Sequence, residues 1–343
     1  MKSSKYILPT LFCFLFFTSC FKEEQYENTA IGNFDACWKL LDEKYCFFEY
    51  KKEEYGLDWD EVYDKYRPMV GPNTSVDSLF SILDSMTQEL RDGHVNIYSN
   101  FNIGRYWKWF TDYPDNFDPI IQENYLGEDY LIAGGLRYKI LPDSIGYIYY
   151  PSFSSLVGEN NLDYVLFHFR DTKGIIFDIR DNGGGILTNV DRIAARFTAD
   201  QFRAGYIQHK TGPGKDDFSS LYPFDQIATP KNRFSYHRPV MLLTNRKVFS
   251  AANQFVSVMR HLPQVTIVGD KTGGGSGLPF NGELPIGWSI RFSASPVYNS
   301  EKEHTEFGIE PDFKVNMTED DICRGIDSII EFAIKKIQND NHL

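Results

Sequence analysis

The sequence predicts an α/β protein in which a core of alternating strands and helices follows a small helical domain. Short apolar runs such as 174–177 and 240–243 alternate with segments of helical periodicity. Strands that are apolar along their whole length and separated by helices are typical of a sheet covered on both faces. Ahead of this region, residues 34–90 carry apolar side chains at the three- and four-residue spacing of amphipathic helices.

The amino-acid composition supports a globular protein with a large core and excludes several other classes. The chain has 343 residues, of which 42% are hydrophobic and 24% are charged. This length and composition exclude a disulfide-stapled mini-protein, a disordered chain and a membrane protein with several spans. The formal net charge of −12 argues against nucleic acid as a partner, because an acidic surface repels phosphate groups.

The first 20 residues have the pattern of an export signal. Two lysines precede a largely apolar run over residues 6–17, and two small residues precede Cys20. The run is too short to cross a bilayer, which takes about 20 residues. The segment resembles a bacterial lipoprotein signal, so we expect residues 1–19 to be removed and Cys20 to carry acyl chains. The protein would then be tethered to the cell envelope, at the outer membrane, in an extracytoplasmic compartment. Plain secretion with cleavage nearby is the alternative.

The N-terminal half divides into a tether, a helical domain and an irregular segment. Residues 20–30 are polar and form the tether, and residues 31–94 form the helical domain. The acidic run 58–61 is typical of a helix start. Residues 95–140 are predicted to form short strands and loops. About 45 residues are too few for a complete inserted PDZ or similar peptide-binding domain.

The remaining residues, 141–340, are predicted to form the α/β core. We expect strands at 145–150, 174–180, 239–245 and 265–269, a strand or hairpin at 288–298, helices at 161–170, 186–197, 250–262 and 320–337, and a polar loop or hairpin insertion at 203–237.

Two glycine-rich segments follow predicted strands. Residues 182–185 read Asn-Gly-Gly-Gly, and residues 272–277 read Thr-Gly-Gly-Gly-Ser-Gly. Glycine lets the backbone approach a ligand closely, and amides that precede a helix stabilise negative charge. A tight strand-to-helix turn would explain only one or two glycines. The G-x-G-x-x-G spacing of dinucleotide-binding sites is absent from the first segment.

Ser250 lies between a predicted strand and a predicted helix, in the segment Phe-Ser-Ala-Ala. A serine in such a turn can present its hydroxyl as a nucleophile while the next backbone amide faces the same space. An ordinary helix N-cap is the commoner reason to find serine at this position. This segment alone therefore favours the cap.

Taken together, these segments resemble the catalytic core of the C-terminal processing peptidase and tricorn protease family, which has a crotonase/ClpP-like α/β fold. The resemblance covers about residues 145–315, and the segment around His94 extends it into the helical domain. The markers are Asp-x-Arg-x-Asn-Gly-Gly-Gly at 178–185, Ser-Ala-Ala at 250–252, Gly-Asp-Lys-Thr-Gly at 269–273 and Phe-Gly-Ile-Glu-Pro-Asp at 307–312.

The resemblance favours the tricorn-like branch of that family. Processing peptidases use a Ser–Lys dyad, but the position of that lysine holds Gly275 here. The resemblance to tricorn-like members implies a Ser–His–Glu arrangement instead, for which this sequence offers His94 and Glu306. They also place a serine beside the histidine, where this chain has Gly93. The group that orients the imidazole therefore stays open between Asp92, Glu306 and a bridging hydroxyl such as that of Ser276.

The resemblance implies a serine endopeptidase acting on extended polypeptide without a cofactor or metal. It assigns Ser250 as nucleophile, His94 as general base, Glu306 as its supporting carboxylate, and the amides of Gly184 or Gly185 and of Ala251 as the oxyanion hole. Lys271 is a rival base, although a salt bridge with Asp270 is the simpler role, and His304 lies close to Glu306 in sequence. The alternatives are a peptide- or lipid-binding lipoprotein on the same fold and, less well supported, a crotonase-type enzyme acting on CoA thioesters.

Overall fold

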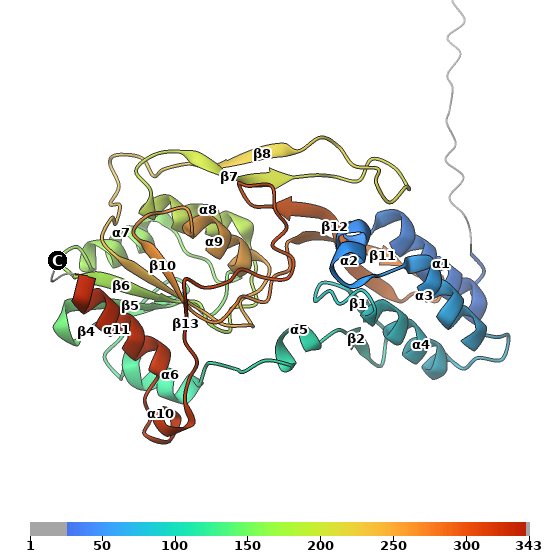
Figure 1. Cartoon of the computed structure of the whole chain (residues 1–343), viewed down its shortest axis with the longest axis horizontal. Helices are drawn as coiled ribbons and strands as arrows, with labels where there is room; N and C mark the ends of the chain where they lie inside the picture. Colours follow the sequence, from blue (N-terminus) through green and yellow to red (C-terminus); the bar gives the residue numbers. More distant parts are fainter. Residues whose placement is uncertain (1–25, 341–343) are drawn as a thin grey trace, which may run out of the picture.

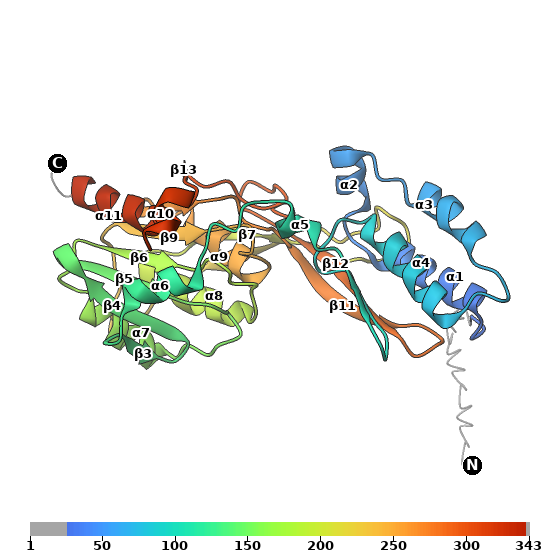
Figure 2. The ribbon, with the colours of Figure 1, turned by 90° about the horizontal axis from the view of Figure 1, so that it is seen from below.

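The computed structural model describes residues 26–340, which form two β-sheets and the helices packed against them (Figure 1). The predicted signal segment and Cys20 lie outside these residues. Helices α1 to α4 lie at one end of an elongated molecule and the larger sheet at the other (Figure 2). The predicted active site therefore combines His94, which follows these helices, with Ser250, which belongs to the part of the chain that contains the larger sheet.

The N-terminal helices are α1 (Ala30–Lys44), α2 (Phe48–Tyr55), α3 (Trp59–Tyr66) and α4 (Val76–Gln88), with a 3₁₀ turn at Arg67–Met69. The side chains of Thr29, Asp58 and Ser75 accept hydrogen bonds from first-turn amides of α1, α3 and α4. Such caps satisfy backbone donors that have no partner within the helix. The predicted helical N-terminal region is confirmed.

These helices pack on a hairpin that comes from the far end of the sequence. The hairpin consists of β11 (Gly277–Glu283) and β12 (Ser289–Tyr298), and β12 also pairs with β1 (Asn96–Tyr98), which in turn pairs with β2 (Ile103–Arg105). Trp288, Ile290 and Phe292 of the hairpin share one buried core with the helices. We call this unit, residues 26–105 with the hairpin 277–298, the N-terminal lobe.

The larger sheet has seven strands in the order β13-β10-β9-β6-β5-β4-β3. Their bounds are β3 (Leu131–Ala133), β4 (Leu136–Leu141), β5 (Ile145–Tyr149), β6 (Gly174–Asp178), β9 (Val240–Thr244), β10 (Val265–Gly269) and β13 (Phe313–Lys314). The strands from β5 to β13 in this order are parallel, whereas β3 and β4 are antiparallel. Every residue of β5, β6 and β9 is buried, as predicted for a sheet covered on both faces.

Helices cover both faces of this sheet. Helices α7 (Glu159–His168), α8 (Leu187–Ala194) and α9 (Ala251–Met259) share one core with Ile175 and Phe177 of β6. Helices α6 (Pro119–Leu126) and α11 (Ser328–Asp340) share another with Ile176 of the same strand. Alternate residues of a strand point to opposite faces, so the predicted α/β class is confirmed.

A second hairpin, β7 (Phe202–Ile207) with β8 (Tyr222–Gln226), belongs to the smaller sheet, whose strand order is β2-β1-β12-β7-β8 (Figure 1). Strand β7 pairs with the end of β12. Beyond β7 the chain reaches the N-terminal lobe, where Lys215 Nζ lies 3.2 Å from Asp60 Oδ2. The predicted insertion at 203–237 is thus a hairpin that contacts both ends of the molecule.

Some predicted elements differ from the observed ones. The final helix is interrupted: α10 (Glu319–Cys323) ends before Gly325, whose φ of 70° is left-handed, and α11 begins at Ser328. The segment 95–140 contains α5 (Lys108–Thr111) and α6 as well as short strands, because Asp118 caps α6 and Pro119 starts it. Short 3₁₀ turns occupy Pro142–Ser144 and Ala195–Phe197. No PDZ domain occurs among residues 26–340.

None of the helices within residues 26–340 combines the length and apolar character that a membrane span requires.

Candidate active site

The three segments singled out in the sequence follow three neighbouring parallel strands. Strand β9 lies between β6 and β10, and the carboxyl ends of parallel strands meet at one edge, where ligands bind in open α/β sheets. Hydrogen bonds join the segments there: Phe249 N donates to Asn182 O (3.1 Å), and Ser250 N donates to Gly274 O (2.8 Å). The glycine-rich segments therefore form the immediate surroundings of Ser250.

Ser250 has an unusual backbone conformation, with φ 56° and ψ −122°. Such angles in a residue other than glycine cost about 1–3 kcal/mol and cluster at functional sites. The Ser250 side chain makes no capping hydrogen bond to α9. Its Oγ instead lies 3.1 Å from His94 Nε2. The N-cap interpretation of Ser250 is wrong, and the predicted nucleophile and base are in contact.

His94 reaches Ser250 from the loop between α4 and β1. Its backbone N–H donates to Asp92 Oδ1 (2.7 Å), and its ring packs on Phe249 with centroids 4.7 Å apart. The residue is only 4% exposed. Burial lowers the pKa of His94 to about 4, although Asp92 acts in the opposite direction. The imidazole is therefore neutral near pH 7, the state in which a ring nitrogen accepts a proton.

Glu306 lies in the loop between β12 and β13 and is buried. Its Oε2 accepts a hydrogen bond from Ser276 N (2.9 Å), and its Oε1 lies 3.4 Å from Lys51 Nζ. Within the described residues no hydrogen bond joins Glu306 to His94, and the buried His94 Nδ1 and Ser276 Oγ have no hydrogen-bond partner. Burial and then the charge of Asp92 raise the pKa of Glu306, while Lys51 lowers it.

Lys51 and Asp92 complete a buried charged cluster with Glu306. Lys51 Nζ lies 3.9 Å from Asp92 Oδ2 and donates to Leu90 O at 2.6 Å. Asp92 Oδ2 also accepts hydrogen bonds from Tyr45 Oη and Ser293 Oγ, both at 2.9 Å. Asp92 thus binds the backbone of His94 through one oxygen and the cluster through the other.

The backbone amides predicted to form the oxyanion hole differ in whether they already donate a hydrogen bond within the protein. Gly184 N donates to Asn182 Oδ1 (3.0 Å), whereas the Gly185 and Ala251 amides have no acceptor among the described residues. A Cβ at Gly184 would lie 2.6 Å from Phe249 O and 2.9 Å from Ser250 Cβ. Gly184 therefore serves close packing beneath the serine, and the free amides of Gly185 and Ala251 are the better donors in this conformation.

The second glycine run is required by close contacts with the segments that carry Glu306 and Ser250. A Cβ at Gly274 would lie 1.8 Å from Glu306 O, and one at Gly275 would lie 2.3 Å from Phe249 Cζ. Both residues also have left-handed φ values, 85° and 78°. A longer side chain at Gly275, where the resemblance would place the dyad lysine, therefore has no room.

The remaining residues considered in the sequence have structural contacts. Lys271 Nζ pairs with Glu310 (3.0 Å), so its salt bridge is confirmed but the predicted partner, Asp270, is wrong. Asp270 instead pairs with Lys314 (3.5 Å). The His304 ring packs on Tyr50 and Tyr298, with centroids 4.2 and 4.4 Å apart.

The Asp-x-Arg part of the first marker is structural. Arg180 is buried and binds Asp178 (2.6 Å) and Asp327 (2.9 Å). Asn182 Nδ2 donates to Tyr150 O (2.8 Å), while its Oδ1 holds the glycine turn through Gly184 N. These contacts fix the end of β6 and α11 relative to the turn that meets Ser250.

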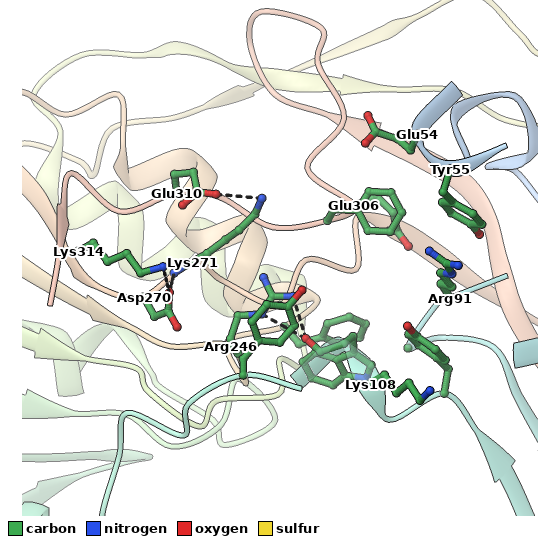
Figure 3. A pocket seen from close by; sticks show the side chains of 17 residues that line it. Glu54, Tyr55, Arg91, Lys108, Arg246, Asp270, Lys271, Glu306, Glu310 and Lys314 are labelled. Atoms are coloured by element: carbon green, nitrogen blue, oxygen red, sulfur yellow. Dashed lines mark hydrogen bonds and ion pairs between the residues drawn. The ribbon is translucent and has the colours of Figure 1, made fainter. Parts of the chain in front are cut away.

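A cavity of about 490 Å³ lies next to the Ser250–His94 pair, between the N-terminal lobe and the larger sheet (Figure 3). Gly93 and Phe249, the residues before His94 and Ser250, line it. Figure 3 shows Arg91 and Tyr55 on one side, and Lys271 with its neighbours on the other. The wall also contains Tyr106, Trp109, Tyr113 and Phe307, so the cavity has aromatic surfaces and charges of both signs. Within residues 26–340, no group of side chains is suited to hold a metal ion.

Two contributors to the site were missed in the sequence. Lys51 is one of several lysines and glutamates on α2, and nothing in the order of these residues distinguishes the buried one. Trp109 stacks on Phe249 with centroids 4.4 Å apart but comes from a segment interpreted as irregular. Its four aromatic residues between 106 and 110 were the available signal.

Comparison with known proteins supports the resemblance. The family model described as "Peptidase family S41" matches residues 144–315, and the "Tricorn protease C1 domain" matches residues 26–88. A crystal structure of a candidate peptidase from Parabacteroides merdae is 53% identical, with a TM-score of 0.86, and the match covers 91% of this chain and 97% of that one.

More distant structures share the fold. Mature CPAF in complex with lactacystin is 13% identical (TM-score 0.70; 90% of this chain and 97% of that one), and the tricorn protease is 19% identical (TM-score 0.54; 91% and 37%). A curated protein of Chlamydia trachomatis serovar D is 29% identical over 129 residues, which are 35% of this chain and 21% of that protein, so the match spans about a fifth of its relative. The match to the S41 model over half of the chain, together with the identity to the Parabacteroides protein, shows that the chain belongs to peptidase family S41.

Proposed function

We propose that this protein is a serine peptidase that cleaves extended polypeptides, with Ser250 as nucleophile and His94 as general base. The observation that carries the proposal is the 3.1 Å contact between Ser250 Oγ and His94 Nε2. The contact joins a strained serine that caps no helix to a buried histidine of lowered pKa. A structural role for the serine would require neither the strain nor the imidazole.

The proposed reaction has two stages. As Ser250 Oγ bonds to the scissile carbonyl carbon, its proton passes to His94 Nε2, and the amides of Gly185 and Ala251 stabilise the oxyanion. The imidazolium then gives its proton to the leaving amine as the C–N bond breaks. Water releases the acyl group from Ser250 by the same steps, with His94 again as base.

A carboxylate would stabilise the imidazolium through His94 Nδ1. Glu306 supports this role because it is buried and bound to the backbone of Ser276. The Ser276 hydroxyl is buried without a hydrogen-bond partner, as is His94 Nδ1. We therefore assign Glu306 as the acid and Ser276 Oγ as its bridging hydroxyl, with Asp92 holding the backbone of His94.

Polypeptide turnover tests the proposal against the alternative of a binding protein on the same fold. The wild-type protein should hydrolyse β-casein, and Ser250→Ala and His94→Ala should each lose nearly all of this activity. Ser300→Ala, at a partly exposed turn serine hydrogen-bonded to Glu301, is the matched control and should be fully active. Saturable binding of casein without turnover by the wild-type protein would contradict the proposal and favour the binding protein.

We also propose that the protein is anchored to the cell envelope through lipid on Cys20. The support is the sequence pattern of residues 1–20, with its basic start, apolar run and small residues before the cysteine. Palmitate labelling of the protein expressed in a bacterial host should be lost in Cys20→Ala and retained in Cys323→Ala. A wild-type protein that stays unlabelled and is released in soluble form would contradict the proposal.

A further inference from the structure

We propose that Lys51 is a positioning residue of the active site, whose buried ammonium holds the Glu306 carboxyl group in its place beside Ser276. This inference rests on the proposed serine peptidase function. It adds a residue from the N-terminal lobe, on α2, to a site otherwise built from the segments around Ser250, His94 and Glu306.

The ammonium group of Lys51 is buried and surrounded by oxygen atoms and aromatic rings. It is 0% exposed, donates to Leu90 O (2.6 Å), and lies 3.4 Å from Glu306 Oε1 and 3.9 Å from Asp92 Oδ2. The ammonium thus donates hydrogen bonds to Leu90 O and Glu306 Oε1 and forms a longer ion pair with Asp92. The rings of Tyr45, Phe47 and Phe307 lie 5.3–5.8 Å from Nζ and separate it from water.

Lys51 contacts both Glu306, the proposed acid, and Asp92, which binds the backbone of His94. Glu306 is held on one oxygen by Lys51 and on the other by Ser276 N, so its carboxylate is fixed from two sides. Asp92 meets Lys51 through Oδ2 and accepts the backbone N–H of His94 through Oδ1. A shift of the ammonium would therefore disturb the placement of the carboxylate and the support of the imidazole together.

Stability alone does not account for this arrangement. Burying an ammonium and two carboxylates costs free energy that their attraction repays incompletely, and apolar residues of similar volume often serve stability as well or better. The cluster also includes Asp92, which accepts a hydrogen bond from the backbone of His94. The location of Lys51 therefore fits a role in which its charge acts on Glu306 and, through it, on His94.

The charges around Glu306 define what Lys51 does. Burial and Asp92 raise the pKa of Glu306, and among the side chains that affect it Lys51 lowers it most. The other titratable side chains that affect or face it are Tyr45, Cys46, Tyr50 and Tyr55, whose pKa values are all raised by burial. These four stay neutral at working pH. Lys51 is therefore the side chain that most opposes the effect of burial and Asp92, which together raise the pKa of Glu306 to about 8.

The test is the pH dependence of kcat/KM for a peptide substrate in Lys51→Met. Without the ammonium, Glu306 requires a higher pH to ionise, so the acid limb of the profile should move upward. A shift of one pH unit lowers kcat/KM below the limb by about tenfold. The loss should fall on kcat rather than KM. Because Lys51 acts through Glu306, the double variant Lys51→Met/Glu306→Gln should be no slower than Glu306→Gln alone.

Two further variants separate positioning from folding. Tyr45→Phe removes a neutral hydrogen-bond donor from the same cluster and should leave the limb where it is. Lys51→Arg keeps the positive charge and should also keep the limb while lowering kcat, so it tests the proposal even if Lys51→Met does not fold. A folded Lys51→Met with the wild-type profile, or an acid limb that persists unchanged in Glu306→Gln, would overturn the inference.

The same experiments distinguish this inference from the proposed function. If the wild-type protein does not turn over peptide and Ser250 does not react with a fluorophosphonate, the proposed function has failed. If the wild-type protein is active and requires Ser250 and His94, but folded Lys51→Met keeps the wild-type pH profile, only the role of Lys51 has failed.

Discussion

Ser250 and His94 are 156 residues apart in the sequence, yet their side chains meet. The backbone of Ser250 is strained, and the hydroxyl is directed to the imidazole rather than to the helix it precedes. The types and positions of Ser250, His94 and Glu306 could be predicted from the sequence through their motifs. Lys51 could not, because burial of one lysine on a charged helix is decided by tertiary packing. The sequence also did not indicate that Asn182 engages the amide of Gly184, because this local contact depends on the conformation of the turn.

The buried state of His94 should be measurable in the pH dependence of stability. The folded pKa of about 4 lies below the ordinary 6.5, so between these values the unfolded chain binds a proton that the folded chain does not. His94 therefore makes stability fall as pH decreases from about 6.5 to about 4, by up to about 3 kcal/mol in total.

Urea denaturation at several pH values checks this prediction. His94→Gln, which does not titrate, should lose less unfolding free energy than the wild-type protein between pH 6.5 and 4.5. His168→Gln, on the exposed side of α7, is the matched control and should follow the wild-type curve. Parallel curves for His94→Gln and the wild-type protein would show that His94 does not titrate as described.

At the scale of elements, the three segments that follow β6, β9 and β10 form the site because their strands are adjacent and parallel. Strands β5, β6, β9 and β10 were predicted within two residues of their observed bounds, since their continuous apolar runs give a strong signal. The last helix was predicted without its break at Gly325, because the apolar spacing continues across it. A functional role for the glycine runs is a prediction from the sequence, but their contacts depend on which loops meet.

Gly275→Ala tests the role of the second glycine run. The new Cβ would lie 2.3 Å from Phe249 Cζ at a residue with φ 78°, so it should displace the ring that packs on His94. We expect a loss of stability of about 1–3 kcal/mol and a large loss of peptide cleavage.

The matched control for this substitution is Gly183→Ala. No atom lies within 4 Å of a Cβ at Gly183, and its φ is not left-handed. Thermal unfolding and peptide cleavage should both stay close to wild type in this variant. Equal behaviour of the two alanine variants would contradict the packing explanation.

At the scale of the whole molecule, the site depends on both ends of the structure. His94 and Lys51 come from the N-terminal lobe, whereas Ser250 follows a strand of the larger sheet. The hairpin of β11 and β12 joins the two parts (Figure 2). The sequence allowed a strand or hairpin at 288–298 but did not reveal that it completes the core of the helical region, because this contact spans about 200 residues. The two-part organisation was predictable, but the joining element was not.

Trp288→Ala tests this dependence. Trp288 is 3% exposed and packs edge-on against Phe80 and Phe101, so its removal should cost about 3–5 kcal/mol. Peptide cleavage should also fall, although Trp288 is not part of the site, because the lobe that carries His94 is weakened. Phe280→Ala, at an exposed position of the same hairpin, should change both properties little. Cleavage at the wild-type rate by folded Trp288→Ala would show that the site does not require this core.

The central claim is that His94 activates the Ser250 hydroxyl. The most direct measurement is the rate and position of fluorophosphonate labelling, mapped by mass spectrometry in wild type, His94→Ala and Ser250→Ala. We predict a single adduct on Ser250 in the wild-type protein, formed much more slowly in His94→Ala and absent from Ser250→Ala. An adduct on another residue, or labelling of Ser250 at the same rate without His94, would contradict the account.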